Sequence, residues 1–293
     1  MIDAGTKTVL PMRDYDLAAT LGCGQAFRWT QRDGAWEGVI DRRWVRLRSV
    51  ERGIEATAAH AATDWKWLTD YLQTNLDLGS VLLTFPDDEP MRAAAAHCRG
   101  LRLLRQDPWE CLASFILSST KQIVQIQQII ALLCERFGEP LSTPPGAILT
   151  RAFPTAERLA SATEAELRAC KMGFRAPSLL AAARRIASGE LDLESLRHLD
   201  VTAAREALVS LRGVGDKIAN CALLFAYGFQ QAFPIDVWVM KALRQLYFPK
   251  RRPTPQRLLN FTRTYFGPNA GYAQQYLFHY MRTRNERNLD EQR

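Results

Sequence analysis

The sequence predicts an α+β protein in which an N-terminal antiparallel sheet domain with helices precedes an all-helical domain. Two observations lead to this prediction. Short, aromatic and partly alternating segments, typical of antiparallel strands, distinguish the first hundred residues from the rest. From Asp107 onward the apolar residues instead recur at the spacing of amphipathic helices. We therefore expect two domains, 1–105 and 106–293.

Turn residues divide the N-terminal part into strands. Arg32-Asp-Gly34 and Asp41-Arg42 are the turns. The strands that we expect around them are 25–29, 35–40 and 43–48. Helical segments are expected to follow near 64–76 and 88–98.

The helical part opens with a recognisable helix start. Asp107 can cap the helix, Pro108 fits its first position, and Glu110 can reach back to the cap. Ser118-Ser-Thr120 interrupts the apolar stripe, and a second helix is expected to run to about Phe137. The further helices that we expect are 156–162, 164–170, 176–188, 202–211, 216–227, 236–247, 254–265 and 268–282.

The charge balance permits a polyanionic partner without requiring one. A total of 38 Lys and Arg against 31 Asp and Glu gives a net charge of +7. A nucleic acid would match such a charge, although ordinary solubility explains it equally well.

The cysteine pattern and the hydropathy indicate an intracellular protein. The six cysteines are scattered without a C-x-x-C motif, which argues against a zinc site or an iron–sulfur cluster. Five of them lie in apolar segments, as expected of buried thiols. We see no signal peptide and no run of 18 apolar residues. We therefore expect no membrane contact and a reducing compartment, either a bacterial cytoplasm or a eukaryotic nucleus.

A glycine hairpin, Gly213-Val-Gly215, is expected to join two helices. Backbone N–H groups of such a turn, at a helix N-terminus, point outward and attract phosphate. On these three residues alone, a grip on a nucleic-acid backbone and a plain helix–helix turn are equally well supported.

Lys217 and Asp236 follow the hairpin. Lys217 lies in the first helical turn, where the positive end of the helix dipole favours the uncharged amine. A free amine attacks electrophilic carbons such as a sugar C1′. Taken alone, a solvated, salt-bridged lysine explains the residue better. Asp236 can cap the next helix, and its carboxylate can also stabilise an oxocarbenium-like sugar or move protons. The two roles of Asp236 are compatible.

In this order, the three elements resemble the helix-hairpin-helix DNA glycosylases with a Gly-Pro-Asp-type loop (HhH-GPD), and most closely the 8-oxoguanine DNA glycosylase (Ogg) family. Four more segments resemble that family, so that the anchors span nearly the whole chain. They are Gly24-Gln-Ala-Phe-Arg-Trp29, Gly100 to Leu112, Met172-Gly-Phe-Arg175 and Gly267 to Phe278. The resemblance implies a TBP-like N-terminal domain and a helix-hairpin-helix catalytic domain.

The resemblance also implies a bifunctional glycosylase and AP lyase. Lys217 matches the nucleophile that attacks C1′ and displaces the damaged base, and the resulting Schiff base permits β-elimination of the 3′ phosphate. Asp236 matches the aspartate that caps a helix and supports charge at the sugar. The implied partner is double-stranded DNA containing oxidised guanine, bound by a monomer. The chemistry needs no cofactor, although hairpin carbonyls of such proteins can hold a monovalent cation.

By resemblance, four residues form a pocket for a flipped base. Gly24 matches the glycine whose carbonyl reads the N7 hydrogen of 8-oxoguanine. Cys221 and Phe278 match the residues that sandwich the base, and Gln274 matches the reader of the Watson–Crick edge. Without the resemblance, we would interpret Cys221 and Phe278 as ordinary core residues.

Further residues match DNA contacts of the family. Phe174 matches an aromatic wedge and Arg175 an arginine that reads the opposite cytosine. An exposed Phe-Arg pair after a glycine fits insertion into DNA, although Phe174 fits a loop anchor equally well. The remaining DNA contacts that we expect are Gly213, Gly215, Thr120 and Gln122.

The sequence departs from the family at the opposite strand. Thr120-Lys-Gln122 replaces three asparagines, and Gln125 stands where relatives carry a second arginine for the opposite cytosine. Trp238 replaces a histidine that contacts a phosphate. We still expect a preference for cytosine opposite the lesion, but these changes leave relaxed discrimination open.

Two rival interpretations remain. A glycosylase of the same superfamily for another base is one, although no cysteine follows Cys221 to form the usual four-cysteine cluster, and alkylbase enzymes lack the lysine. A non-catalytic helix-hairpin-helix module is the other, although it would need the glycines without Lys217, Asp236, Gly24 and Phe278.

Overall fold

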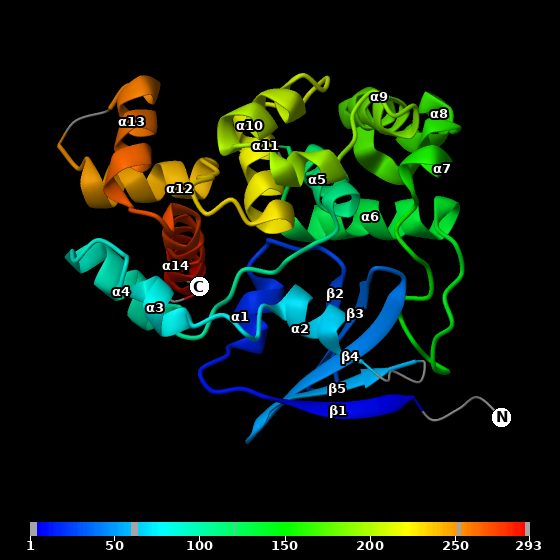
Figure 1. Cartoon of the computed structure of the whole chain (residues 1–293), viewed down its shortest axis with the longest axis horizontal. Coiled ribbons are helices and arrows are strands. Elements are labelled where there is room, and N and C mark those ends of the chain that lie inside the picture. The colour runs from blue at the N-terminus through cyan, green and yellow to red at the C-terminus, as the bar shows by residue number, and fades with distance from the viewer. Residues whose placement is uncertain (1–4, 60–63, 120, 251–252, 291–293) are drawn as a thin grey trace.

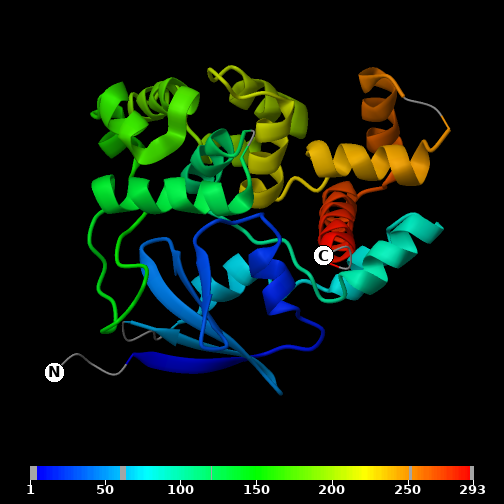
Figure 2. The same cartoon turned by 180° about the vertical axis from the view of Figure 1, so that it is seen from behind.

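The computed structural model describes residues 5–59, 64–119, 121–250 and 253–290, with only the backbone for the last five. Figure 1 shows an N-terminal sheet below a larger helical part, and the reverse view in Figure 2 has the same arrangement. This confirms the predicted α+β class.

Within the described residues, the sheet has five strands in the order β1-β5-β4-β3-β2, with every neighbouring pair antiparallel. They are β1 (Thr6–Pro11), β2 (Trp29–Arg32), β3 (Ala35–Ile40), β4 (Arg43–Val50) and β5 (Gly53–Ala58). The strands predicted at 35–40 and 43–48 are confirmed.

The strand predicted at 25–29 is wrong except for Trp29, where β2 begins. Gly24 has a φ of +84°, a left-handed conformation that interrupts an extended chain. The side chain of Gln25 turns inward, is fully buried and donates to backbone carbonyls, including that of Arg102. This segment is therefore an ordered loop. The sequence pattern predicts neither β1 nor β5.

Two of the N-terminal helices pack on the sheet, and two lie elsewhere. Those on the sheet are α1 (Leu17–Gly22) and α2 (Lys66–Leu72), whose leucines join the sheet's own core cluster. The others, α3 (Leu78–Leu82) and α4 (Glu89–His97), lie beside the long helix α14 (Ala270–Asp290) (Figure 1). Helices predicted near 64–76 and 88–98 are thus confirmed as α2 and α4. The boundary between 105 and 106 stays a prediction.

The helical part follows the predicted order closely. Its elements are α5 (Pro108–Leu117), α6 (Ile123–Phe137), α7 (Ala156–Ala160), α8 (Glu164–Leu167), η1 (Arg168–Met172), η2 (Gly173–Arg175), α9 (Ala176–Ala187), η3 (Glu194–His198), α10 (Val201–Val209), α11 (Asp216–Ala222), η4 (Leu223–Tyr227), α12 (Val237–Ala242), η5 (Leu243–Tyr247) and α13 (Pro255–Tyr265), before α14. Asp107 caps α5 by accepting from the N–H of Glu110, 2.7 Å away, as predicted. The prediction that Glu110 reaches back to the cap is wrong, because its carboxylate instead pairs with Arg28 at 3.2 Å.

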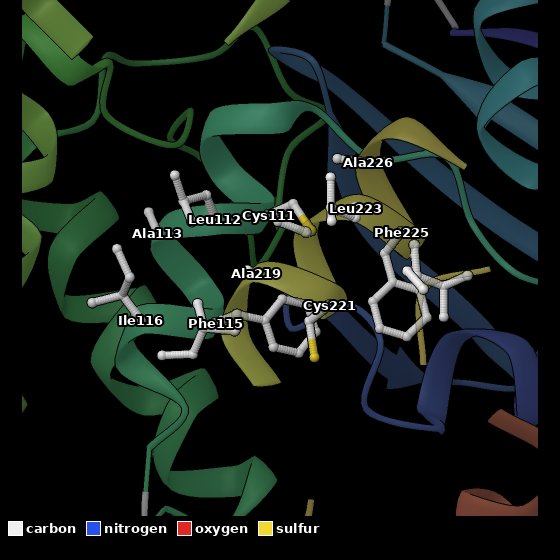
Figure 3. Packing of buried hydrophobic residues seen from close by; sticks show 14 of the residues in the cluster. Cys111, Leu112, Ala113, Phe115, Ile116, Ala219, Cys221, Leu223, Phe225 and Ala226 are labelled. Atoms are coloured by element: carbon white, nitrogen blue, oxygen red, sulfur yellow. The ribbon is translucent and has the colours of Figure 1, made fainter. Parts of the chain in front are cut away.

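The centre of the helical core is the contact between α5 and α11. Figure 3 shows side chains of α5 facing those of α11 and its π-helical continuation η4. Phe115 stacks on Phe225 with ring centroids 5.6 Å apart. This packing fixes the helix that carries Lys217 against the end of α5.

All six cysteines, each of which the structure describes, are buried and unpaired, which confirms the expected thiols. In the described part of the chain, no helix combines the length and the apolar character that crossing a membrane would need.

Candidate active site

The glycine hairpin between α10 and α11 presents its backbone outward. Gly213 has a φ of +79°, and a Cβ added there would lie 2.3 Å from Ser178 Oγ, so both conformation and packing require glycine. Gly215 caps α11 in an extended conformation, and a Cβ there would meet no atom within 4 Å. Val214 is buried and anchors the turn. The hairpin therefore leaves the open start of a helix accessible to an anion.

Lys217 is half-buried in the first turn of α11 and points toward the end of α5. Its Nζ donates a hydrogen bond to Ser118 Oγ at 2.9 Å, and Ser118 Oγ in turn donates to the Phe115 carbonyl at 2.7 Å. The same Nζ lies 5.1 Å from the centroid of the Phe115 ring. Among the described residues, no carboxylate lies within ion-pairing distance of Lys217. The salt-bridged lysine that the sequence also allowed is therefore wrong.

Asp236 caps α12, as predicted. Its Oδ1 accepts from the N–H groups of Trp238 at 3.0 Å and Val239 at 2.8 Å. Burial raises the pKa of the Asp236 carboxyl above its usual value, while these hydrogen bonds and the charge of Lys217 act in the opposite direction. The carboxylate is thus held in partly dry surroundings within electrostatic reach of the amine.

Cys221 lies one turn after Lys217 on α11 and is 3% exposed. Burial raises the pKa of its thiol to about 11, although the charge of Lys217 lowers it. The thiol is therefore neutral near pH 7, and it acts as an apolar surface rather than as a nucleophile.

Gly24 and Phe278 are neighbours, although they are far apart in the sequence. A Cβ added to Gly24 would lie 2.7 Å from Ile123 Cδ1 and 3.8 Å from Phe278 Cε1. Gln274, one turn before Phe278 on α14, is 3% exposed, and its Oε1 has no hydrogen-bond partner among the described residues. A buried amide oxygen without a partner is costly unless a ligand satisfies it.

The predicted site residues thus fall into two groups. Lys217, Asp236 and Cys221 form one, and Gly24, Gln274 and Phe278 form the other. Aromatic side chains connect the loop after Gly24 to the lysine. Phe27 meets Phe115 edge to face, with ring centroids 5.5 Å apart, and Phe115 lies under the Lys217 amine.

Phe174 and Arg175 differ in exposure. Phe174 is 65% exposed at a bend where Lys171 and Gly173 both have positive φ, which confirms its predicted exposure. The predicted exposure of Arg175 is wrong, because it is only 4% exposed. Its guanidinium stacks 4.2 Å from the Phe174 ring centroid and donates to the Met172 carbonyl at 3.4 Å. Burial also lowers the pKa of Arg175 below its usual value.

Three of the residues that depart from the family pattern, Gln122, Gln125 and Trp238, have structural partners here. Thr120 lies outside the described residues. Gln122 is exposed at the start of α6, and its N–H donates to Gln125 Oε1 at 3.2 Å, so Gln125 caps its own helix. Trp238 is half-buried under the ammonium of Lys241, 5.4 Å from its ring centroid.

Sequence reasoning missed several polar residues around these groups. Ser118, the partner of Lys217, was predicted only to interrupt the apolar stripe between two helices. Gln106, Gln275 and Arg282, which contact the loop around Gly24, carried no prediction. Buried glutamines within apolar segments were the available signal, because such amides need specific partners.

Comparison with known proteins identifies two family models in sequence order. The N-terminal domain of 8-oxoguanine DNA glycosylase matches residues 7–112, and the HhH-GPD superfamily of base excision DNA repair proteins matches residues 113–268.

Individual relatives agree with these matches. A probable N-glycosylase/DNA lyase of Methanothermobacter thermautotrophicus is 30% identical, over 93% of this chain and 95% of its own length. The structure of MBOgg1 with a low-affinity DNA ligand superposes with a TM-score of 0.90 at 33% identity, over 96% of this chain and 97% of that one. The Clostridium acetobutylicum 8-oxoguanine glycosylase/lyase, bound to double-stranded DNA with cytosine opposite 8-oxoguanine, gives 0.87 at 30% identity, over 96% and 99%. The chain therefore belongs to the 8-oxoguanine DNA glycosylase family of the HhH-GPD superfamily, and it is a DNA N-glycosylase and lyase of base excision repair.

Proposed function

We propose that this protein removes 8-oxoguanine from double-stranded DNA through a Schiff base on Lys217, and then cleaves the strand by β-elimination. One observation carries the proposal: a half-buried amine beside a helix start, held by a hydroxyl and without a carboxylate partner among the described residues. Such an amine can act as a nucleophile once it loses its proton.

The steps follow from that amine. Lys217 Nζ bonds to C1′ while the bond from C1′ to the base breaks, and the base leaves with a proton. Opening of the sugar ring gives an iminium between Nζ and C1′. Loss of a proton from C2′ then breaks the bond from C3′ to its oxygen, which releases the 3′ phosphate. Water finally hydrolyses the Schiff base and restores the amine.

Asp236 supports the first step by charge. Positive charge develops on the sugar as the base departs, and a nearby half-buried carboxylate stabilises it more strongly than one in water would. Its hydrogen bonds to Trp238 and Val239 fix its orientation before the reaction.

The flipped base would enter between Cys221 and Phe278. The neutral thiol and the aromatic ring provide the apolar faces, and the unpartnered Oε1 of Gln274 can accept from the Watson–Crick edge. Gly24 would read N7 through its carbonyl, because an acceptor there favours the N7 hydrogen of 8-oxoguanine over the lone pair of guanine.

The remaining predicted residues would hold the DNA. Gly213 and Gly215 offer backbone N–H groups to a phosphate, and exposed Phe174 would fill the vacated stack with Arg175 behind it. Gln122 contacts the strand at the start of α6, and Thr120 stays a prediction from the sequence. We also propose that the protein acts as a monomer.

Cytosine is the opposite base that we propose. The Clostridium acetobutylicum relative was crystallised with cytosine opposite 8-oxoguanine. In this chain, Gln125 is engaged in capping α6 and replaces an arginine, so the preference rests mainly on Arg175. Excision rates on duplexes with each of the four opposite bases test this, and faster excision opposite adenine would contradict it.

Borohydride trapping tests the proposed chemistry. The wild-type protein should form a covalent adduct with an 8-oxoguanine:cytosine duplex, and Lys217→Gln should form none while still binding the duplex. Lys66→Gln, an exposed lysine of α2, is the matched control. Equal strand cleavage by Lys217→Gln and wild type would refute the Schiff base, and base release without an adduct in the wild type would indicate a monofunctional glycosylase.

A further inference from the structure

The carbonyls of residues 22–25, the loop around Gly24, differ in their hydrogen bonds. The carbonyl of Gly22 accepts from Arg282 at 3.0 Å, and that of Gln25 accepts from Gln106 Nε2 at 2.7 Å. The carbonyl of Cys23 has a longer contact, 3.5 Å, with Gln275 Nε2. Among the described residues, no donor reaches the carbonyl of Gly24, which lies between them.

Two of these donors come from the helix that also forms a wall of the base pocket. Gln275 follows Gln274 on α14 and is 2% exposed. Arg282 lies one turn after Phe278, with its guanidinium carbon 5.9 Å from the ring centroid. The helix that provides the stacking ring therefore also holds the neighbouring Gly24 loop at a fixed distance.

Gln106 connects the same loop to the helix of the nucleophile. Its side chain holds the Gln25 carbonyl, and its backbone N–H donates to the carbonyl of Phe225 at 2.8 Å, in η4 directly after α11. Gln25 adds a second tie, because its Oε1 accepts from the N–H of Leu104 at 2.9 Å. The loop is thus anchored on both sides, toward α14 and toward Lys217.

We infer that Arg282, Gln275 and Gln106 are positioning residues that fix the loop of residues 22–25 and leave the carbonyl of Gly24 free for the base. The inference rests on the proposed function of this site. A carbonyl that distinguishes a hydrogen from a lone pair on one atom of the base must be held within a fraction of an ångström of its correct position. A displacement of about 1 Å can reduce the rate on the order of a hundredfold. Carbonyls bound to side chains cannot turn toward the base, so among the described residues 22–25 Gly24 alone presents a free acceptor.

The test compares two reactions of the same amine. Excision of 8-oxoguanine needs the Gly24 loop, whereas cleavage of a preformed abasic site uses Lys217 without a base to read. The double variant Arg282→Met with Gln275→Leu removes both donors of α14. We expect single-turnover excision to fall by about tenfold or more and abasic-site cleavage to stay within about twofold. Arg284→Met, an exposed arginine on the same helix, controls for the lost charge.

Each outcome decides the inference. Unchanged excision, or an equal fall in both reactions, would overturn it, because a merely structural role slows both. Arg282→Lys keeps a donor and should recover part of the excision rate. If the double variant fails to fold, Gln106→Met replaces it in the same comparison of excision with abasic-site cleavage. This variant removes only the side-chain donor to Gln25. A wild-type protein that cleaves abasic sites but releases no 8-oxoguanine would instead refute the proposed substrate, and the inference with it.

Discussion

The amine of Lys217 donates a hydrogen bond to the hydroxyl of Ser118, 2.9 Å away and 99 residues earlier in the chain. Ser118 is fixed in turn by its own bond to the Phe115 carbonyl at the end of α5. The hydroxyl therefore orients the amine through a neutral hydrogen bond, whereas an aspartate at this place would form an ion pair with it.

Ser118→Ala should slow Schiff-base formation about fivefold to tenfold, because one orienting hydrogen bond is worth about 1 kcal/mol. Affinity for DNA should stay unchanged, since the hydroxyl lies behind the amine. Single-turnover trapping rates measure the effect, with Ser118→Thr expected to restore much of it. A rate for Ser118→Ala equal to that of the wild type would show that Ser118 does not orient the amine.

The structure also indicates which features the sequence can predict. The motif residues Lys217 and Asp236 stand out because hairpin and cap chemistry is local. The contact with Ser118 depends on how α5 packs on α11, which no local pattern encodes. Strand β5 cannot be predicted locally either, because its segment contains alanines and has weak β-propensity. It lies between β1 and β4 and pairs with both, and this position buries Ile54 and Ala56.

Asp236→Asn separates charge from capping. Asparagine caps helices about as well as aspartate, so α12 should remain intact while excision falls, because the carboxylate no longer stabilises the sugar cation. Asp236→Ala should lose the cap as well and reduce the free energy of unfolding by about 1 kcal/mol. Rates of excision and chemical denaturation of both variants distinguish the two roles, and full activity of Asp236→Asn would exclude the electrostatic one.

The difference in stability between the wild type and Asp236→Asn should depend on pH with a definite sign. Burial raises the pKa of Asp236 in the folded state. A raised carboxyl pKa favours folding below the unfolded value, and this contribution disappears as pH rises through the folded pKa. Wild type should therefore be less stable than Asp236→Asn at pH 7, and the difference should vanish below about pH 4. Unfolding curves at a series of pH values measure this difference, and a constant one would contradict it.

The two hairpin glycines should respond differently to alanine. Gly213→Ala forces a side chain into a φ of +79° and against Ser178, and we expect it to lower the free energy of unfolding by about 1–3 kcal/mol. Gly215→Ala meets no neighbour, and alanine is only a poorer helix cap than glycine, so the free energy of unfolding should fall by less than about 1 kcal/mol. Its methyl group would stand beside the open helix start, and DNA affinity should fall about fivefold. Thermal unfolding and duplex titrations of both variants test the contrast; equal losses of stability would contradict it.

Phe174→Ala should leave the fold intact and weaken base extrusion. The ring is 65% exposed, so little packing is lost, although Arg175 loses its stacking partner. Stacking of an aromatic side chain on a base is worth about 1–3 kcal/mol, so excision from a fully paired duplex should fall by about tenfold. The loss should be smaller when the lesion faces a mismatched base, because that base is already partly unstacked. Single-turnover rates on the two duplexes provide the comparison, and an equal loss on both would mean that Phe174 holds the DNA without replacing the flipped base in the stack.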